Sequence, residues 1–315
     1  MIEERLKQMK YIWNTTDFQL DNTAVSLGKF DGFHVGHRLL IEYVTSLKKK
    51  GLQAVTFSFF QHPGNFVANQ SKGLIYSEAE KVRKAEELGS DYFISYPFNE
   101  EVMHTEPEEF VRSVLVEKLG AKVIVVGNDY HFGKNRAGDV SVLRKLGKKY
   151  GFEVKAFDKV VMDGAEVSST RIRQELVNGS LERANEMLGS PYSITGIVVH
   201  GNEIGRTLGM PTANILPAKE KLIPPNGVYA SRILVEDKIY HGITNIGYKP
   251  TVGDKNEKGV ETFIFDFSGN LYDKEITVEL FAYERGEKKF GSLEELKAQM
   301  ECDCQFGRDF FENGI

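Results

Sequence analysis

The chain has little cysteine, no long apolar run and no excess of positive charge. Its two cysteines are Cys302 and Cys304, and no further cysteine or nearby histidine completes a four-ligand metal set, which favours reduced thiols at the surface. Apolar runs such as 123–126 are far too short to span a bilayer. The first residues carry acid, and no apolar signal segment follows them. These absences predict a cytoplasmic protein without a membrane partner.

The charge balance argues against nucleic acid as a partner. The formal net charge is -5 and the sequence pI is about 5.9, so the surface offers no general attraction to phosphates. An anionic ligand must therefore be held by local groups. Hydrophobic residues make up 41% and charged residues 27% of the 315 residues, which is ordinary globular composition at a length that suits two domains. The composition leaves homo-oligomerisation open.

The first part of the chain alternates between predicted strands and helices. Apolar strands are predicted at 24–27, 53–59, 92–96, 122–126 and 153–157. Amphipathic or capped helices are predicted at 38–49, 77–88 and 105–119. Strand and helix in alternation predict an α/β domain with a parallel sheet covered by helices on both faces.

The pattern changes after about residue 188. Short strands rich in Val, Ile, Tyr and Phe are predicted at 193–199, 228–235, 262–267 and 276–281, and an amphipathic helix is predicted at 292–300. Evenly spaced strands with frequent turns favour a small antiparallel β-barrel followed by a terminal helix. We therefore expect two domains, 1–188 and 189–315, with the boundary near Gly189-Ser190-Pro191.

A segment rich in glycine and histidine, 27–37, lies between the first predicted strand and the first helix. An open α/β sheet binds ligands at this place, and glycines allow backbone amides to approach a phosphate. His34 and His37 are three residues apart at the start of the helix, where both can donate to phosphate oxygens. A histidine pair alone would more often be structural or bind a metal, but the glycines and the position favour phosphate.

A second polar segment, 167–173, contains Ser169 and Thr170 followed by Arg173. Serine and threonine cap a helix and leave amides available to an anion, and the arginine adds a charged fork one turn later. An ordinary helix start with solvated arginines is the alternative reading.

Together these motifs resemble the adenylyltransferase module of bacterial bifunctional riboflavin kinase/FAD synthetases, which belongs to the nucleotidyltransferase class marked by His-x-Gly-His. The resemblance implies a Rossmann-type nucleotidyltransferase fold, with His34, His37 and Arg173 serving adenylyl transfer. The implied ATP ligands are Gly28, Phe30, Asp31, Gly36, Asp129, Ser169 and Thr170. The implied flavin contacts in this module are His62 and Pro63. The sequence departs from the family pattern close to these two residues, because Phe60 occupies a position where the family usually has an acid.

The second domain resembles the riboflavin kinase module of the same family. The segment 205–214 matches its central motif, in which Thr212 and Asn214 would bind Mg²⁺ and nucleotide phosphates together with Gly205 and Arg206. The resemblance implies that Glu261, expected just before a strand, is the catalytic base and that Arg285 contacts the flavin. Considered alone, Glu261 would be read as a solvated strand residue.

The resemblance implies that the protein phosphorylates riboflavin with ATP and Mg²⁺ and then adenylylates FMN with a second ATP, which gives FAD and pyrophosphate. Two alternatives remain at this point. The Phe60 departure favours a riboflavin kinase whose first domain has lost adenylyl transfer. A non-catalytic flavin sensor would have little need for both Glu261 and the Thr212–Asn214 motif.

Overall fold

The computed structural model describes residues 9–60, 73–201, 205, 208–248 and 258–313. These residues form two compact units. The first contains the described residues up to 60 together with 78–168, and the second contains 73–77 together with the described residues from 169 onward. The short segment 73–77 thus belongs to the second unit although the chain on both sides of it belongs to the first.

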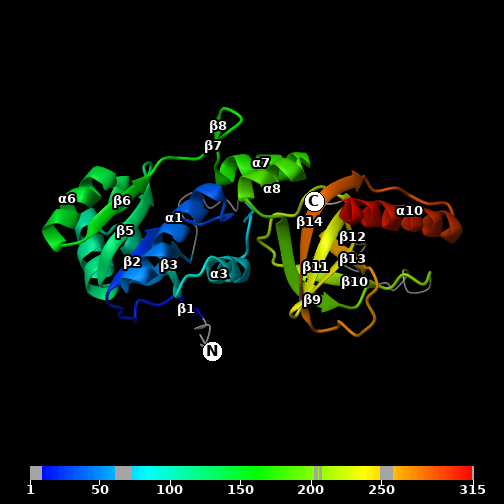
Figure 1. Ribbon diagram of the computed structural model, residues 1–315, viewed down its shortest axis with the longest axis horizontal. Helices are drawn as coiled ribbons and strands as arrows, with labels where there is room; N and C mark the ends of the chain where they lie inside the picture. Colours follow the sequence, from blue (N-terminus) through cyan, green and yellow to red (C-terminus); the bar gives the residue numbers. More distant parts are fainter. Residues whose placement is uncertain (1–8, 61–72, 202–204, 206–207, 249–257, 314–315) are drawn as a thin grey trace. The chain divides into compact units, whose positions relative to one another are not determined.

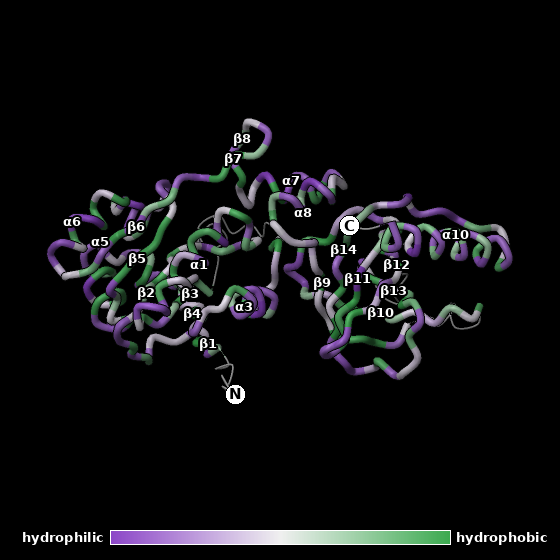
Figure 2. Tube along the Cα trace, viewed as in Figure 1, coloured by the Kyte–Doolittle hydropathy of each residue, from purple (hydrophilic) through white to green (hydrophobic). Residues whose placement is uncertain are grey.

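The first unit is built on a six-stranded sheet in the order β1-β4-β3-β2-β5-β6, with every neighbouring pair parallel (Figure 1). The strands are β1 (Lys10–Trp13), β2 (Thr23–Leu27), β3 (Gln53–Phe59), β4 (Tyr92–Tyr96), β5 (Ala121–Gly127) and β6 (Glu153–Phe157). All five residues of β2 are buried, which is expected of a central strand covered on both faces. Figure 2 shows the hydrophobic residues concentrated along these strands.

Helices cover the two faces of this sheet. On one face, η2 (Val111–Lys118) and α6 (Val140–Tyr150) pack with the apolar side chains of β2, β3 and β5. The other face is covered by α1 (Val35–Ser46) and α3 (Glu78–Glu87). The remaining elements of the unit are η1 (Leu47–Lys50), α4 (Glu100–Met103), α5 (Pro107–Phe110), η3 (Lys134–Arg136), β7 (Val161–Met162) and β8 (Ala165–Glu166).

The second unit is a closed antiparallel barrel in the order β10-β13-β12-β11-β14-β9. Its strands are β9 (Tyr192–Val199), β10 (Thr212–Pro217), β11 (Gly227–Val235), β12 (Lys238–Tyr248), β13 (Lys258–Ile264) and β14 (Glu275–Arg285). The terminal helix α10 (Leu293–Glu312) packs against β11 and β12 (Figure 1). Closure pairs every strand on both sides, so the barrel has no free edge.

Two helices that precede the barrel in the chain belong to the same unit. They are α7 (Ser169–Asn178) and α8 (Leu181–Leu188). The Asn185 side chain ties α8 to the barrel, because its amide donates to the Leu280 carbonyl at 2.9 Å and its oxygen accepts from the Tyr192 amide at 2.7 Å. The domain boundary at 188/189 stays a prediction.

The predicted fold class is confirmed, and several elements differ in extent. The strand expected at 262–267 occupies Lys258–Ile264, so Glu261 lies inside β13 and not before a strand. The terminal helix runs twelve residues beyond the expected end at Met300, to Glu312. Strands β1, β10 and β12 were not predicted, because their polar and glycine residues interrupt the apolar alternation.

Candidate active sites

The loop after β2 holds its aromatic residues in an unusual backbone conformation. Phe30 and Phe33 have φ angles of 47° and 44°, and Gly32 between them has a φ of 96°. Non-glycine residues rarely adopt this left-handed region, so the surrounding structure must stabilise it. Both phenylalanine rings are buried, and their centroids lie 5.6 Å apart. Their packing stabilises the loop conformation. The predicted ligand-binding segment is therefore a turn with a defined, left-handed backbone conformation at the carboxyl edge of the sheet.

His34 and His37 come together at the start of α1. His34 is the N-cap residue, and its Nδ1 accepts a hydrogen bond from the His37 amide at 3.4 Å. The two imidazole rings are stacked with centroids 3.7 Å apart. Burial lowers the pKa of His34 to about 4, and burial followed by the neighbouring His34 lowers the pKa of His37 well below its usual value. Both rings are therefore neutral at pH 7, and since Nδ1 of His34 accepts, its proton is on Nε2.

Two glycines of this loop leave space that a side chain would fill. A Cβ at Gly28 would lie 3.0 Å from the Phe30 ring, and one at Gly36 would lie 3.2 Å from the His34 imidazole. Either substitution would displace the ring that it meets. This packing explains why glycine suits these two positions of the predicted ATP loop.

Two predicted ATP ligands, Asp31 and Asp129, are electrostatic neighbours of the histidine pair. The carboxylates of both oppose the lowering of the pKa of His34. Asp31 is buried, whereas Asp129 follows β5 and forms an ion pair with Lys159 at 3.2 Å. Sequence residues more than 90 positions apart thus meet at the carboxyl edge of the sheet.

The other residues predicted for adenylyl transfer lie in the second unit. Ser169 and Thr170 begin α7, and the Arg173 Nε donates to the Gly73 carbonyl at 2.9 Å. Their convergence with His34 and His37 on one ATP therefore stays a prediction. His62 and Pro63, the predicted flavin contacts, lie outside the described residues.

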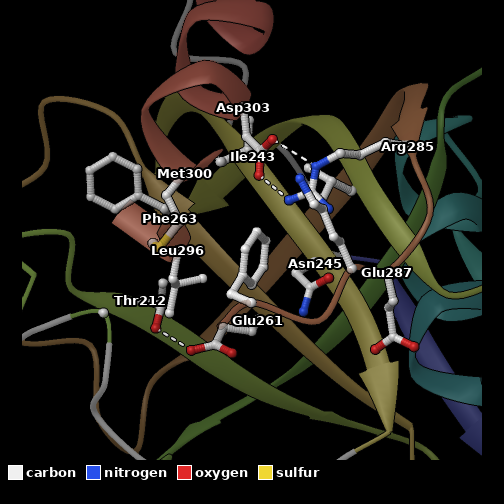
Figure 3. Close-up of a pocket in the computed structure, with 14 residues that line it drawn as sticks. Thr212, Ile243, Asn245, Glu261, Phe263, Arg285, Glu287, Leu296, Met300 and Asp303 are labelled. Carbon is white, nitrogen blue, oxygen red and sulfur yellow. Dashed lines mark hydrogen bonds and ion pairs between the residues drawn. The ribbon is translucent and has the colours of Figure 1, made fainter. Parts of the chain in front are cut away.

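The barrel contains a cavity of about 250 Å³ that opens beside α10 (Figure 3). It collects three residues predicted from the sequence, Thr212, Glu261 and Arg285, and Gly205 also reaches it. The rest of the lining is Val228, Ile243, Asn245, Phe263, Glu287, Lys288, Phe290, Leu296, Met300 and Asp303. Arg206 lies outside the described residues.

Strand register brings Glu261 beside two amides. On β13 it pairs with Asn214 of β10 on one side and with Asn245 of β12 on the other. The Thr212 hydroxyl donates a hydrogen bond to the Glu261 carboxylate, which Figure 3 shows as a dashed line. Thr212, Asn245 and Glu261 thus form one polar end of the cavity, and Asn214 pairs with Glu261 in the strand register but is not among the lining residues.

The oxygen donors at this end fit a magnesium ion. The Thr212 hydroxyl and the Asn214 amide oxygen are hard ligands, and both lie on β10 within reach of Glu261. Among the described residues, no cluster of three His, Cys, Asp or Glu side chains could hold a metal by itself. Mg²⁺ typically takes only one or two protein ligands and completes its shell with water and substrate phosphates.

An ion pair forms the opposite end of the cavity. Arg285 donates from Nε to Asp303 Oδ1 at 2.8 Å and from a terminal nitrogen to Oδ2 at 2.5 Å, and the pair raises the pKa of Arg285. The Gln299 amide donates to the same Asp303 oxygen at 2.9 Å. In Figure 3 this pair lies away from Thr212 and Glu261, with the apolar Phe263, Leu296 and Met300 beside the space. Arg285 thus reaches the cavity, as predicted, but its guanidinium is bound to a carboxylate.

Sequence reasoning missed Asp303, whose side chain is only 3% exposed. Its spacing carried a signal, because Asp303 falls on the same helical stripe as Leu293, Leu296 and Met300. An acid on the apolar face of an amphipathic helix requires a buried cation. Asn245 was given no role from the sequence, and its place beside Glu261 follows from strand register.

Comparisons with known proteins identify a family domain in each part of the chain. The riboflavin kinase family model matches residues 188–311, and the FAD synthetase family model matches residues 17–171. The bifunctional riboflavin kinase/FMN adenylyltransferase of Escherichia coli K12 is 35% identical over 309 residues, which cover 97% of this chain and 98% of that protein. The chain belongs to the bifunctional riboflavin kinase/FMN adenylyltransferase family. The family member from Listeria monocytogenes is 37% identical over 301 residues, 94% of this chain and 95% of that one.

A solved structure described as a macrolide-efflux protein from Streptococcus pneumoniae has the same fold as this family member. It is 30% identical, with a TM-score of 0.83 over 96% of this chain and 99% of that one. In the part of this chain that the structure describes, no helix has the length and apolar character needed to cross a membrane.

Proposed function

We propose that this chain phosphorylates riboflavin to FMN in the barrel unit and adenylylates FMN to FAD in the parallel-sheet unit, with ATP as the donor in both steps. The observation that carries the proposal is the presence of both family domains, and the stacked His34–His37 pair in one and the Thr212–Glu261 hydrogen bond in the other support it. We place both reactions in the cytoplasm, with small molecules and no nucleic acid as partners. The composition supports this, because it offers no basic surface.

The kinase step requires activation of a hydroxyl. The 5′-hydroxyl of riboflavin attacks the γ-phosphate of ATP, its oxygen–phosphorus bond forms as the bond to ADP breaks, and its proton passes to Glu261. The Thr212 hydroxyl orients the carboxylate for this transfer, and strand register places two asparagines beside it. Mg²⁺ held by Thr212 and Asn214 would offset the phosphate charge.

The flavin ring fits the other end of the cavity. Phe263, Leu296 and Met300 offer an apolar wall for the ring, and the Arg285–Asp303 pair closes that end. The ribityl chain would then run toward Glu261. This arrangement separates an apolar binding end from a polar reacting end, as small-molecule sites commonly do.

The adenylyl step requires no base, because the FMN phosphate is already anionic at neutral pH. Its oxygen attacks the α-phosphate of ATP and displaces pyrophosphate. His34 and His37, although neutral, can each donate one hydrogen bond to phosphate oxygens, and Arg173 adds a fixed positive charge. Gly28, Phe30, Asp31, Gly36, Asp129, Ser169 and Thr170 would position the nucleotide.

One observation favours a second candidate, a riboflavin kinase with weak adenylyl transfer. Phe60 takes the place of the family's acid, and its ring packs edge-on against Trp13 with centroids 5.3 Å apart. The Phe60 amide donates to the Tyr96 carbonyl at 2.8 Å, so the backbone path after β3 is held even without the acid. A non-catalytic flavin sensor is less well supported, because it would not need the Thr212–Glu261 pair.

A single assay separates the three candidates. The purified full chain is incubated with riboflavin, ATP and Mg²⁺, and riboflavin, FMN and FAD are separated over time. We expect FMN to form first and FAD to follow. FMN as the final product would support the kinase alone, and an unchanged riboflavin pool would contradict both enzymatic candidates.

A further inference from the structure

A buried lysine lies beside the histidine pair of the first unit. Lys81 is in the first turn of α3, and its side chain is only 7% exposed. Lysine is seldom this buried without a strong partner. Neither the motifs nor the comparisons give this residue a role, so its surroundings are the guide.

The packing of α3 against α1 brings Lys81 to His37. Near their C-terminal ends the two helices are joined, because the Thr45 hydroxyl donates to the Leu88 carbonyl at 3.1 Å. Two helical turns earlier, about seven residues, are His37 on α1 and Lys81 on α3. The ammonium of Lys81 accordingly contributes to the lowered pKa of His37, after burial and His34.

Both helices begin at the ligand-binding edge of the sheet. α1 follows the carboxyl end of β2, and α3 ends near the amino end of β4, where the Asp91 amide donates to the Ala54 carbonyl at 2.8 Å. The first turn of α3 is therefore directed toward the carboxyl edge. Two helix N-termini and an ammonium thus lie at this corner, together with the acids Glu78 and Glu80 in the first turn of α3.

The ammonium is only weakly satisfied. Within the described residues its recorded polar contact is Glu78 Oε2 at 3.5 Å, and the other oxygen of that carboxylate accepts from the Tyr11 hydroxyl at 3.0 Å. An ammonium has three donors, so at least one is available to a further acceptor. On the histidine side, the Nδ1 of His37 is also buried without a hydrogen-bond partner among the described residues. Desolvated donors of this kind favour the arrival of an anion.

We propose that Lys81 binds a phosphate group of the adenylylation substrates beside His37, and is thus a further substrate-binding residue of the parallel-sheet unit. This inference rests on the proposed adenylyl transfer. A neutral histidine pair can supply hydrogen bonds but no charge, and Lys81 adds a positive charge that is buried beside His37. The phosphate is that of FMN or one of the phosphates of ATP, and the kinetic test distinguishes them.

The test compares Lys81→Met, which keeps the apolar stem and removes the charge, with Lys81→Arg, which keeps the charge. Lys84→Met is the matched control, because Lys84 lies one turn further along α3 and pairs with Glu87 at 2.9 Å. FAD formation from FMN, riboflavin phosphorylation and the unfolding temperature are measured for the full chain. A lost hydrogen bond to a charged group predicts a fall of about tenfold to a hundredfold in kcat/KM for FAD formation in Lys81→Met.

The pattern of loss decides the outcome. We expect Lys81→Arg to recover most of the FAD formation, and Lys84→Met and riboflavin phosphorylation to stay within twofold of the wild type. A rise in KM for ATP assigns the ATP phosphates, a rise in KM for FMN assigns the FMN phosphate, and a loss in kcat alone assigns a contact made in the transition state. Normal FAD formation in Lys81→Met, or equal loss of both activities, overturns the proposal.

Two further measurements keep the test decisive. If Lys81→Met does not fold, Lys81→Gln replaces it, because it keeps a polar end without the charge. If the wild type makes no FAD, adenylyl transfer itself is refuted, and calorimetric titration with a non-hydrolysable ATP analogue then tests Lys81 separately. Equal affinity of wild type and variant for the analogue would leave Lys81 without a role in ATP binding.

Discussion

The two units present their candidate residues from different parts of the secondary structure. In the parallel-sheet unit, His34 and His37 lie in a loop and the first helical turn after β2, whereas in the barrel Thr212 and Glu261 lie within strands. The cause is burial. Every residue of β2 is covered, so a parallel strand can offer polar groups only beyond its carboxyl end, while a barrel strand can direct alternate side chains into a cavity.

The difference extends to charge. The barrel places a carboxylate, Glu261, at the polar end of its cavity, and the parallel-sheet unit places neutral imidazoles and two helix N-termini at its loop. A carboxylate suits the removal of a proton from a hydroxyl, and donors suit an anion that is already deprotonated. If the two units carry separate reactions in this way, substitutions in the site of one unit should leave the reaction of the other unit unchanged.

The largest expected effect is at Glu261. Glu261→Gln keeps the shape and the bond to Thr212 but cannot accept a proton, so riboflavin phosphorylation should fall by about a hundredfold to ten-thousandfold. FAD formation from supplied FMN should be unchanged, and so should the KM for ATP. Glu236→Gln, which alters an exposed acid paired with Lys274, is the control. Near wild-type phosphorylation at saturating ATP and Mg²⁺ would show that Glu261 is not the base.

The reciprocal substitution is His37→Ala. Loss of one positioned donor should reduce FAD formation from FMN by about a hundredfold, with riboflavin phosphorylation unaffected. The matched control is His104→Ala, because His104 is exposed and its ring nitrogen forms a hydrogen bond with the Glu100 carbonyl within its own helix end. A variant that folds normally but loses both activities equally would contradict the separation of the two sites.

A smaller effect is expected at the far end of the barrel cavity. Asp303→Asn removes the carboxylate that holds Arg285, so the KM for riboflavin should rise by about tenfold while kcat changes less. Asp309→Asn on the same helix is the control, since Asp309 is exposed and accepts from Gln305. Comparison of kcat with KM decides the role of Arg285. A fall in kcat without a change in KM would show that Arg285 acts in the reaction and not in flavin binding.

The sequence alone predicted those elements that depend on interactions between residues close together in the chain. Apolar alternation and helix caps predicted β4 and β6 to the residue, and the glycine–histidine segment predicted the loop that stacks His34 on His37. What it could not supply is cross-chain register. That Glu261 pairs with Asn214 and Asn245 depends on how three strands align, and no single window of sequence contains that information.

The same limit applies to buried charges. Lys81 was expected only as part of a helix, and Asp303 lay beyond the predicted helix end at Met300, because one sequence does not reveal which helix packs against which partner. The contact between α1 and α3, and the ion pair that joins Asp303 of α10 to Arg285 of β14, belong to the tertiary structure. The spacing of Asp303 from Leu293, Leu296 and Met300 at least indicated burial, whereas the sequence around Lys81 gave no such indication.

The smallest expected effect concerns a second acid beside the Arg285–Asp303 pair. Burial, followed by the charge of Asp303, raises the pKa of Glu284 to about 7 from its usual 4.5, and Arg285 opposes this only in part. One of its carboxylate oxygens is buried without a hydrogen-bond partner among the described residues. Burial, followed by the charges of Asp303 and Glu284, raises the pKa of Cys304 to about 11, and Arg308 opposes this in part.

The sign of the effect on stability follows from the direction of this shift. Between pH 4.5 and 7 the folded state binds more protons at Glu284 than the unfolded state does, so stability falls as the pH rises through this window and stays reduced above it. Glu284→Gln removes that loss. Because the side chain is partly exposed, we expect a gain of only about 1 kcal/mol after solvent screening, or about 2–4 °C in the unfolding temperature of the barrel unit.

Calorimetric scans of wild type and Glu284→Gln at pH 5 and pH 8 measure this. The variant should exceed the wild type by the larger margin at pH 8, where Glu284 is ionised beside Asp303. Glu301→Gln, which alters an exposed acid on α10, should show no such pH dependence. A variant whose advantage is the same at both values would show that Glu284 keeps one protonation state throughout.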